Sequence, residues 1–276
     1  MMHRTAIRVY VGWYVTLAFV LIAAPARAQF QPRPIGELPT GEQYHAEAAA
    51  GFWFPTATMI VSSESLGIVG TTIDFKPDLG LQDKTLPDLR LVLSPSRRHK
   101  FRFEFIPIKY ESTGTLKRTI IFNGQRYDLG LPVTSLLYWK AYRIAYEFDF
   151  ISNNRGFAGF VVEAKYTDVT VNLASTVATE FARARAPIPA IGGIGRVYVV
   201  SNISVTGEVT GFKLPEDLVV GTHAHYVDFD LYGTVNFTNN IGAQVGYRSL
   251  NVGYTADSDT GAFKEKGIFL GVVTRY

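Results

Sequence analysis

The residues of this chain best suited to chemistry are His223 and His225, with Asp228 and Asp230 a few positions later. Histidine and aspartate together can act as a general base or bind a metal ion. The residues around them alternate between apolar and polar, as in a β-strand, where side chains two positions apart point to the same side. The histidines would then lie on one side of the strand and the aspartates on the other. Without a β-bulge they cannot form one compact site, so the pattern favours a histidine pair at the rim of a sheet.

Familiar catalytic motifs do not occur in the sequence. It contains no GxSxG, HExxH or Walker A pattern, which are the usual signals for a nucleophilic serine, a catalytic zinc or a bound phosphate. Gly192, Gly193 and Gly195 form a cluster in a predicted strand, where glycine favours curvature or close packing over phosphate binding. We therefore expect no catalytic residue, no metal site and no cofactor.

A larger set of acids and bases repeats at every second position. In residues 136–150 the even positions are mostly apolar or aromatic, while the odd positions include Arg143, Glu147 and Asp149. This alternation predicts a strand with one apolar and one charged face. Because both signs alternate, we expect the charged faces to pair in a network of ion pairs and hydrogen bonds. The set comprises Asp88, Arg90, Arg102, Glu104, Arg143, Glu147, Asp149, Glu163, Lys165, Arg196, Glu208, Asp228, Asp230, Arg248 and Arg275.

Ten predicted strands would position these residues. They cover residues 44–54, 85–93, 99–110, 136–150, 156–169, 191–200, 203–212, 223–236, 241–254 and 266–276. Short polar connections alternate with long ones, including 170–190 and 255–265, as in a transmembrane antiparallel up-and-down β-barrel. The predicted fold is therefore an all-β barrel of ten strands. Eight strands would leave 191–212 outside the wall, and twelve would count the hairpin around Asn123 and Gly124 as part of it instead of as an extension.

The end of the chain completes this pattern with one more strand and a terminal aromatic residue. Ile268, Leu270, Val272 and Tyr276 share one face of this strand. The segment resembles the C-terminal insertion signal of Gram-negative outer-membrane β-barrels, and the layout resembles the small OmpA/OmpW-like barrels. The resemblance implies insertion by the barrel-assembly machinery, and outer-membrane lipid and lipopolysaccharide as the surroundings.

The start of the chain has the features of a secretory signal peptide. Arg4 and Arg8 precede an apolar stretch, and Ala26 and Ala28 supply the small residues of a cleavage site. The apolar stretch is shorter than the roughly 20 residues that a spanning helix needs. We therefore expect cleavage after Ala28, a periplasmic lead-in over 29–43 without structure of its own, and the barrel over 44–276.

Charge and cysteine content exclude further classes of function. The chain has 27 Lys and Arg against 24 Asp and Glu. Arg4, Arg8 and Arg27 leave with the predicted signal, and 27 minus 3 is 24, so the mature chain is formally neutral. A basic surface for nucleic acid is therefore not expected. The sequence has no cysteine, which excludes disulfides and thiolate chemistry.

The distribution of charge indicates which face of the sheet meets lipid. A soluble β-protein would bury its apolar face and expose its charged face. Here the apolar face is rich in Phe and Tyr, while the other holds most of the strand charges, so we expect the apolar face to meet lipid and the charged face to line the lumen. Lys109, Lys140 and Asp168 interrupt the apolar face near the predicted extracellular ends, where they can snorkel to the interface or meet lipopolysaccharide phosphates.

The long connection over residues 55–84 is unusually apolar for a loop, which predicts that it packs against something. It either extends the flanking strands or covers the barrel mouth, where a small apolar ligand could contact Leu66, Ile68, Ile73, Phe75 and Leu79. The sequence thus predicts a non-enzymatic barrel with a mostly closed lumen that is structural or that binds or passes small apolar molecules. The alternatives are a hydrolase active at the rim, such as a protease or a lipid A-modifying enzyme, and a narrow diffusion pore.

Overall fold

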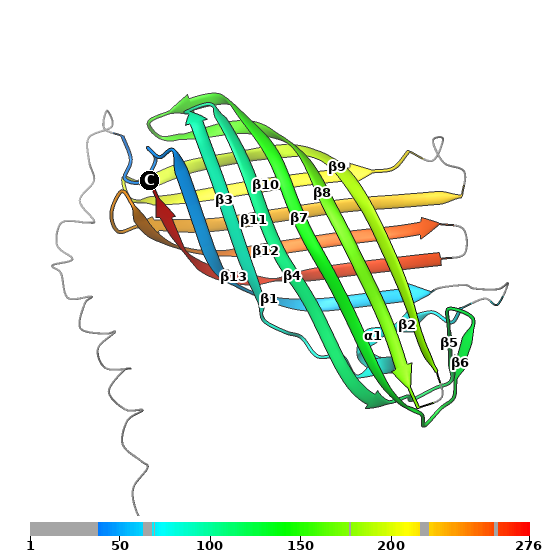
Figure 1. Cartoon of the computed structure of the whole chain (residues 1–276). Helices are drawn as coiled ribbons and strands as arrows, with labels where there is room; N and C mark the ends of the chain where they lie inside the picture. Colours follow the sequence, from blue (N-terminus) through cyan, green and yellow to red (C-terminus); the bar gives the residue numbers. More distant parts are fainter. Residues whose placement is uncertain (1–37, 63–67, 69, 177, 216–220, 257–258) are drawn as a thin grey trace, which may run out of the picture. The chain divides into compact units, whose positions relative to one another are not determined.

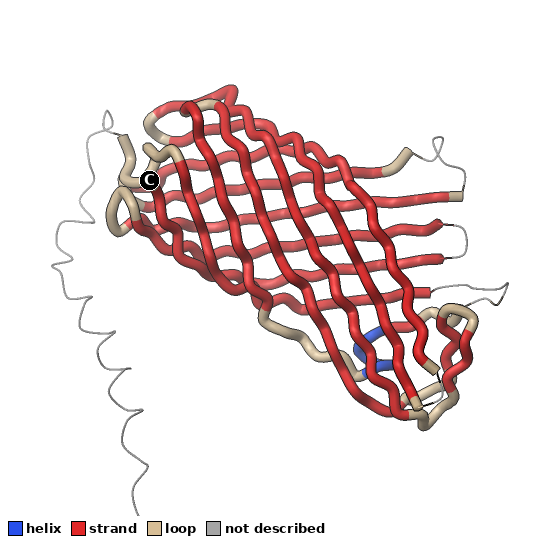
Figure 2. The backbone as a smooth tube through the Cα atoms, viewed as in Figure 1, coloured by secondary structure: helices blue, strands red, loops and turns tan. Residues whose placement is uncertain are grey.

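A computed structural model of the chain describes residues 38–276, except 63–67, 69, 177, 216–220 and 257–258. The predicted signal peptide and residues 29–37 lie outside the described residues. Residues Arg33–Tyr276 form one compact unit, and its described part is almost entirely β-structure (Figure 1, Figure 2). In the part of the chain that the structure describes, no helix is long and apolar enough to cross a membrane.

Ten long antiparallel strands form a closed barrel. Each strand pairs with its neighbours in chain order, and the last pairs with the first to close the wall. The prediction of ten strands is therefore confirmed, and the alternatives of eight and twelve are wrong. The strands are β1 (Ala46–Ser62), β3 (Leu86–Ser96), β4 (His99–Thr115), β7 (Pro132–Asn153), β8 (Gly156–Ser175), β9 (Thr179–Val200), β10 (Ile203–Lys213), β11 (Thr222–Asn236), β12 (Ile241–Ala256) and β13 (Asp259–Arg275).

The two ends of the barrel differ. Short turns join β3 to β4, β7 to β8, β9 to β10 and β11 to β12 at the end where β1 begins and β13 finishes. We call this the turn end. The opposite end carries the longer connections from β1 to β3, from β4 to β7 and from β10 to β11, and we call it the loop end.

Small elements decorate the loop end. β2 (Ile73–Asp74) pairs with β1 and leads into α1 (Phe75–Leu79). β5 (Ile120–Phe122) and β6 (Gln125–Tyr127) form a separate hairpin. Its turn residues Asn123 and Gly124 have φ angles of 49° and 78°, as a type I′ turn requires. The predicted hairpin is therefore present as an extension and does not belong to the wall.

Several strands run further than the sequence pattern predicts. Most residues of the predicted loops 170–190 and 255–265 belong to strands. Only residues 176–178 separate β8 from β9, and only residues 257–258 separate β12 from β13. The alternation of apolar residues stops at the edge of the apolar band. Antiparallel hydrogen bonding needs no such alternation and continues beyond that edge.

Residues 38–45, the described part of the segment before β1, are fixed against the turn end, although they contain no helix or strand. The Thr40 amide donates to the Ser201 carbonyl at 2.8 Å, and Asn236 Nδ2 donates to the Thr40 carbonyl at 2.7 Å. The His45 amide donates to the carbonyl of Tyr276 at 2.6 Å. The described part of the predicted lead-in, residues 38–43, therefore packs onto the barrel without a helix or strand of its own.

The wall is apolar outside and largely charged inside. Phe103, Tyr142 and Phe229 are exposed on the outside, at 37%, 41% and 38%. Arg143 and Asp228, each next to one of these aromatic residues in sequence, are buried on the inside at 7% and 3%. The core of a soluble β-protein would show the reverse arrangement.

Toward the loop end the wall separates into two sheets. β9 pairs with β10 only as far as Ile191 and Gly211, and β1 pairs with β3 only as far as Trp53 and Leu86. Beyond these points one sheet contains β4, β7, β8 and β9, and the other contains β10 to β13 with β1. The two sheets run in different directions (Figure 1). Buried apolar side chains fill much of the space between them.

Candidate functional site

Every charged residue predicted for the lumen lies on the inner face of the barrel. Arg90 and Arg102 are half-buried there. The others are buried: Asp88, Glu104, Arg143, Glu147, Asp149, Glu163, Lys165, Arg196, Glu208, Asp228, Asp230, Arg248 and Arg275. The strand alternation places them there because residues at every second position share one side.

A continuous chain of ion pairs crosses the lumen. Near the turn end, Lys100 Nζ lies 2.7 Å from both Glu147 Oε1 and Asp149 Oδ2. Arg102 Nη1 contacts Glu147 at 2.6 Å, and Arg102 Nη2 contacts Glu208 at 2.7 Å. Because β4 carries Arg102 and β10 carries Glu208, this last bond spans the barrel interior.

Arg143 is the centre of the network. Its guanidinium bonds to Glu163 on the next strand, to Glu104 on the preceding barrel strand and to Glu208 across the lumen. Three carboxylates thus surround one cation. This arrangement uses the fixed fork of donors that a guanidinium presents.

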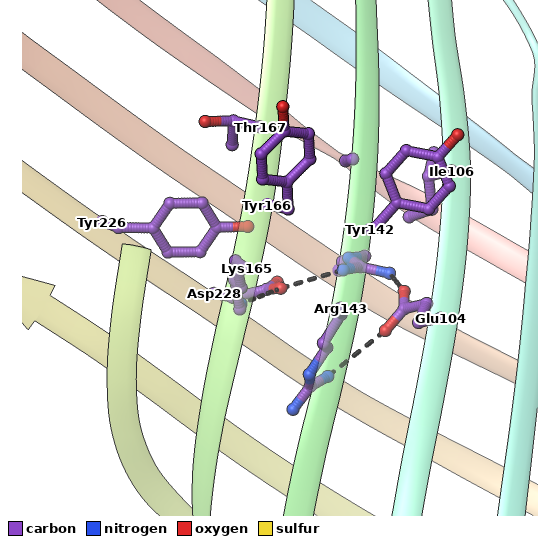
Figure 3. A pocket seen from close by; sticks show the side chains of 11 residues that line it. Glu104, Ile106, Tyr142, Arg143, Lys165, Tyr166, Thr167, Tyr226 and Asp228 are labelled. Atoms are coloured by element: carbon purple, nitrogen blue, oxygen red, sulfur yellow. Dashed lines mark hydrogen bonds and ion pairs between the residues drawn. The ribbon is translucent and has the colours of Figure 1, made fainter. Parts of the chain in front are cut away.

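Arg248 and Lys165 complete the network on the side of the loop end. Arg248 Nη2 and Lys165 Nζ each contact Asp228 Oδ2 at 2.8 Å, and Arg248 also bonds to Glu104. Arg248 Nε lies 3.7 Å from Asp230 Oδ1. Figure 3 shows Glu104, Arg143, Lys165 and Asp228 converging from different strands.

Two smaller groups of polar contacts lie nearer the turn end. Arg275 Nε contacts Glu47 Oε2 at 2.5 Å. Arg196 Nη1 and the Tyr198 hydroxyl both reach Glu42 Oε2, at 3.4 and 2.6 Å. Glu42 belongs to the segment before β1, so this segment adds a carboxylate to the lumen.

Sequence reasoning missed Lys100 and Glu42. Lys100 shares the parity of Arg102 and Glu104, so alternation alone could have included it. Its position beside a turn hid it. No periodicity points to Glu42, because it lies before the first strand and reaches Arg196 only through the folding of residues 38–45 against the turn end.

The network crosses the lumen. A ten-stranded barrel is narrow, and a buried charge is tolerated only when partners compensate it. The bonds of Glu208 to Arg102 and to Arg143 join opposite parts of the wall. Arg248 on β12 and Glu104 on β4 add a further bond across the interior. Charged side chains therefore occupy the space that an open channel would need.

Beyond the network, toward the loop end, the inner face becomes apolar. On β7 the inward residues after Arg143 are Ala141, Trp139 and Leu137, and the last two are each only 2% exposed. β4 changes in the same way, from Glu104 to Ile108. The sequence contains this change, but dividing each strand into one apolar and one charged face concealed it.

An apolar cavity of about 430 Å³ lies in this half of the barrel. Trp139 and Phe263, from opposite sheets, meet edge to face in its wall with ring centroids 4.7 Å apart. Tyr226 borders both the cavity and the charge network, and its ring lies 4.1 Å from Lys165 Nζ. Other lining residues are Met59, Leu137, Val169, Ile188, Phe212 and Val252.

The apolar connection between β1 and β3 packs into the same half. Ile73, Phe75 and Leu79 are 1%, 1% and 2% exposed. These predicted ligand contacts are therefore covered by protein, and the cavity is lined by other residues. Ile68 is exposed at 43%, and Leu66 lies outside the described residues.

An ion pair joins this connection to the next long one. Arg118 Nε and Nη2 donate to the two Asp78 oxygens at 2.8 and 2.7 Å, and the Asp74 amide donates to Asp78 at 2.9 Å. The hydrogen bonds from Arg118 hold the pKa of Asp78 below its ordinary value. The same bonds raise the pKa of Arg118.

The histidine and aspartate residues do not meet. His223 and His225 are exposed on β11, and His225 also borders the cavity, whereas Asp228 and Asp230 are buried inside at 3% and 4%. Within the described ranges, no group of three or more metal-ligating side chains could hold a metal ion. The strand therefore separates the four residues, as its alternation requires.

The residues of the predicted insertion signal lie on the outer face of β13 and at the chain terminus. Ile268, Leu270 and Val272 are exposed at 58%, 48% and 59%. Tyr276 is exposed at 88%, and its amide donates to the Ala46 carbonyl at 2.8 Å. The apolar side chains are thus directed away from the lumen.

No family model and no curated protein sequence matches the chain. Among solved structures, the outer membrane protease OmpT from Escherichia coli is similar, with 7% identity, a TM-score of 0.54 and coverage of 87% of this chain and 99% of that chain. The toluene transporter TodX of Pseudomonas putida covers 93% of each chain at 9% identity and a TM-score of 0.30. The translocator domain of the autotransporter NalP from Neisseria meningitidis covers 85% of this chain and 89% of that chain at 9% identity and a TM-score of 0.34. The likeness to OmpT extends to the fold alone, which is the closed antiparallel ten-stranded β-barrel of outer-membrane proteins.

Proposed function

We propose that this protein is a non-enzymatic barrel of the Gram-negative outer membrane that binds a small apolar molecule in its loop-end cavity. The turn end faces the periplasm, and the loop end faces outward. The charge network closes the lumen, so the protein is not an open diffusion pore. The cavity that Trp139 and Phe263 line together is the observation that carries the proposal.

The outer surface supports a membrane location. Side chains such as Phe103, Ile144 and Leu231 are exposed at 37%, 58% and 46%, which is costly in water and favourable in hydrocarbon. The predicted signal peptide, and the predicted insertion signal of β13 and Tyr276, are typical of the export and insertion route. We therefore include the barrel-assembly machinery among the partners.

Charges at the border of the apolar surface support contact with lipopolysaccharide. Lys140 lies opposite Asp168 in the register of β7 and β8. Arg183 and Arg185 contact Asp168 at 2.6 and 3.3 Å and are 44% and 52% exposed. With Lys109, these cations sit at the loop-end border of the apolar surface, where anionic phosphate groups would meet them.

The walls of the cavity favour an apolar ligand over a polar one. Val169, Val252 and Phe263 offer no hydrogen-bond donor or acceptor in their side chains. A polar group placed against them would lose its bonds to water without replacement. An apolar molecule would instead remove apolar surface from water.

Bromobenzene and tryptophan fluorescence test this proposal directly, because bromine quenches an indole that it touches. One full-length variant keeps Trp139 alone, through Trp13→Phe and Trp53→Phe. A matched variant keeps Trp53 alone, through Trp13→Phe and Trp139→Phe. Trp53 is also fully buried, at 0% exposure, but it lies beside Arg248 in the charged region.

We expect saturable quenching of Trp139 in the refolded barrel and only weak, non-saturating quenching of Trp53. Val252→Phe should abolish the saturable phase by filling the cavity. Val245→Phe makes the same change on the outer face of the same strand, where Val245 is 60% exposed, and should leave the quenching intact. Equal quenching of both tryptophans, or no effect of Val252→Phe, would refute the proposal.

A further inference from the structure

One polar atom in the lining of the loop-end cavity has no hydrogen-bond partner. Trp139 lines the cavity and is 2% exposed, yet its indole Nε1 donates to no acceptor in the part of the chain that the structure describes. Other buried side-chain atoms without a partner in these ranges belong to residues outside the cavity lining, most of them charged residues of the lumen. The unpaired donor is therefore a distinguishing feature of this cavity.

A buried indole N–H without a partner is unfavourable. The group can donate a hydrogen bond but cannot accept one. Burial removes its bond to water, and nothing in the described ranges replaces that bond. Buried polar groups of native proteins almost always have a partner, so an unpaired one calls for an explanation. An acceptor atom supplied by a bound ligand would provide the missing partner.

Trp53 shows how the same barrel pairs a buried indole. This side chain is 0% exposed, and its Nε1 donates to the Gly267 carbonyl at 3.3 Å. Gly267 lies opposite Pro55 in the register of β1 and β13, and proline has no amide hydrogen to offer. Trp139 instead lies in an unbroken ladder with β4 on one side and β8 on the other, where backbone carbonyls accept from backbone amides.

The side chains around Trp139 do not replace the missing acceptor. Phe263 meets the indole edge to face, with ring centroids 4.7 Å apart and an angle of 78° between the rings. An aromatic face accepts an N–H only weakly. Leu137, Val169 and Val252, which also line the cavity, have no acceptor in their side chains. A carbonyl or ether oxygen of a ligand would be a stronger partner than any of them.

We propose that the ligand of the loop-end cavity carries one hydrogen-bond acceptor on an otherwise apolar body, and that Trp139 Nε1 donates to this acceptor. The proposal rests on the proposed function of the cavity and narrows the ligand class to small ketones, esters and ethers. A hydrocarbon of the same shape fills the same space but leaves the donor unpaired. Trp139 therefore discriminates between the two kinds of ligand.

A matched pair of ligands tests the proposal. Para-fluoroacetophenone and para-fluoro-α-methylstyrene have nearly the same shape, but the second carries a methylene group in place of the carbonyl oxygen. Fluorine NMR titration of the refolded full-length barrel gives both dissociation constants without a tryptophan as the reporter. The quantity compared between variants is the ratio of the two constants at one detergent concentration, so that partition of the ligands into detergent cancels.

Trp139→Phe removes the donor and keeps an aromatic ring. We expect this substitution to weaken binding of the ketone by about tenfold relative to the alkene. Saturable binding of the alkene by the same variant would show that its cavity is intact. Trp53→Phe is the matched control, because it makes the same change at an indole that is already paired with Gly267. It should leave the ratio unchanged.

The indole proton of Trp139 gives a second readout in the native protein. Its NMR resonance is assigned by its absence from the spectrum of Trp139→Phe. The two ligands have similar rings, so a difference between their effects on this resonance reports the hydrogen bond. We expect the ketone to shift the proton downfield relative to the alkene. The Trp53 indole proton should not distinguish the two ligands.

Two kinds of result would contradict the proposal. Equal ratios in the native and Trp139→Phe proteins, or equal shifts of the Trp139 indole proton with both ligands, would show that the donor is not used. Saturable binding in these experiments would leave the proposed function standing. Absence of saturable binding of both ligands to the native protein would refute the proposed function and the ligand class together.

Discussion

At the scale of single residues, Arg143 holds the lumen network together, because it bonds to Glu104, Glu163 and Glu208. Arg143→Met keeps much of the side-chain length but leaves these buried carboxylates short of a counter-charge. We expect a loss of about 3–5 kcal/mol in the free energy of unfolding. Denaturant unfolding of the refolded barrel measures it.

The matched control for this substitution is Arg126→Met. Arg126 pairs with Asp128 at 2.8 Å, but the two side chains are 69% and 70% exposed. An exposed pair contributes at most about 1 kcal/mol. If Arg143→Met cost no more than Arg126→Met, the network would not be a buried structural unit.

The second prediction at this scale concerns pH. Hydrogen bonds from Arg118 lower the pKa of Asp78, so the folded state binds this proton less readily than the unfolded state. The stability from this pair is fully present above the ordinary carboxyl pKa of about 3.9, and it is lost as the pH falls through the lowered pKa. Hydrogen exchange at α1, corrected for intrinsic rates, should therefore accelerate in acid.

Asp78→Asn should remove most of this acid-dependent change in protection. Asp128→Asn alters an exposed carboxylate paired with Arg126. This substitution should leave the acid-dependent change in protection unaltered. An Asp78→Asn protein whose α1 amides respond to acid as in the native protein would contradict the role assigned to the ion pair.

The residue scale also shows what alternation can and cannot predict. Parity alone placed residues as far apart as Asp88 and Arg275 on the inner face, because every second side chain of a strand shares a side. It could not pair Arg102 with Glu208, since that contact depends on barrel closure. It also missed Glu42, which reaches the lumen through a segment without periodicity.

At the scale of elements, β9 shows where prediction from sequence stops. Pro187 and Pro189 argue against a central strand, so the strand predicted from the sequence begins only at residue 191. The structure continues it to Thr179 because those prolines lie where β9 has an edge. The apolar content of residues 55–84 correctly predicted that this connection packs against something. Whether its residues face a ligand or other protein could not be read from composition.

Two neighbouring glycines of β9 provide a matched test of close packing. A Cβ atom on Gly192 would overlap the Val209 carbonyl and Thr210, whereas one on Gly193 would lie 3.7 Å from its nearest neighbour, the Gly159 carbonyl. We expect Gly192→Ala to destabilise the barrel by about 1–3 kcal/mol, and Gly193→Ala by less than about 0.5 kcal/mol. Denaturant midpoints compare the two.

Equal midpoints for these two variants would show that β9 and β10 are not as close at Gly192 as described. The comparison is internal, because both substitutions add one methyl group to adjacent residues of one strand. It therefore separates packing from the general cost of replacing glycine.

At the scale of the whole molecule, the barrel interior is divided into a charged region toward the turn end and an apolar region toward the loop end. We propose that the first closes the lumen, and the second holds the cavity. We therefore expect no stepwise conductance from the native protein in planar bilayers. Arg143→Ala combined with Glu208→Ala removes side chains that join opposite parts of the wall. This double variant should show stepwise conductance.

The control for the conductance measurement is Arg183→Ala combined with Asp168→Ala. This ion pair, at 2.6 Å, lies outside the lumen, so its loss should produce no stepwise conductance. Stepwise conductance from the native protein would mean that water and ions pass the network, and the closed lumen would be wrong.

Anomalous scattering from bromine shows where a brominated ligand binds in a crystal of the barrel. We expect a bromobenzene peak inside the loop-end half, in the cavity that Trp139 and Phe263 line and on the loop-end side of Lys165. Bromine found only on the lipid-facing surface, with an empty interior, would contradict it.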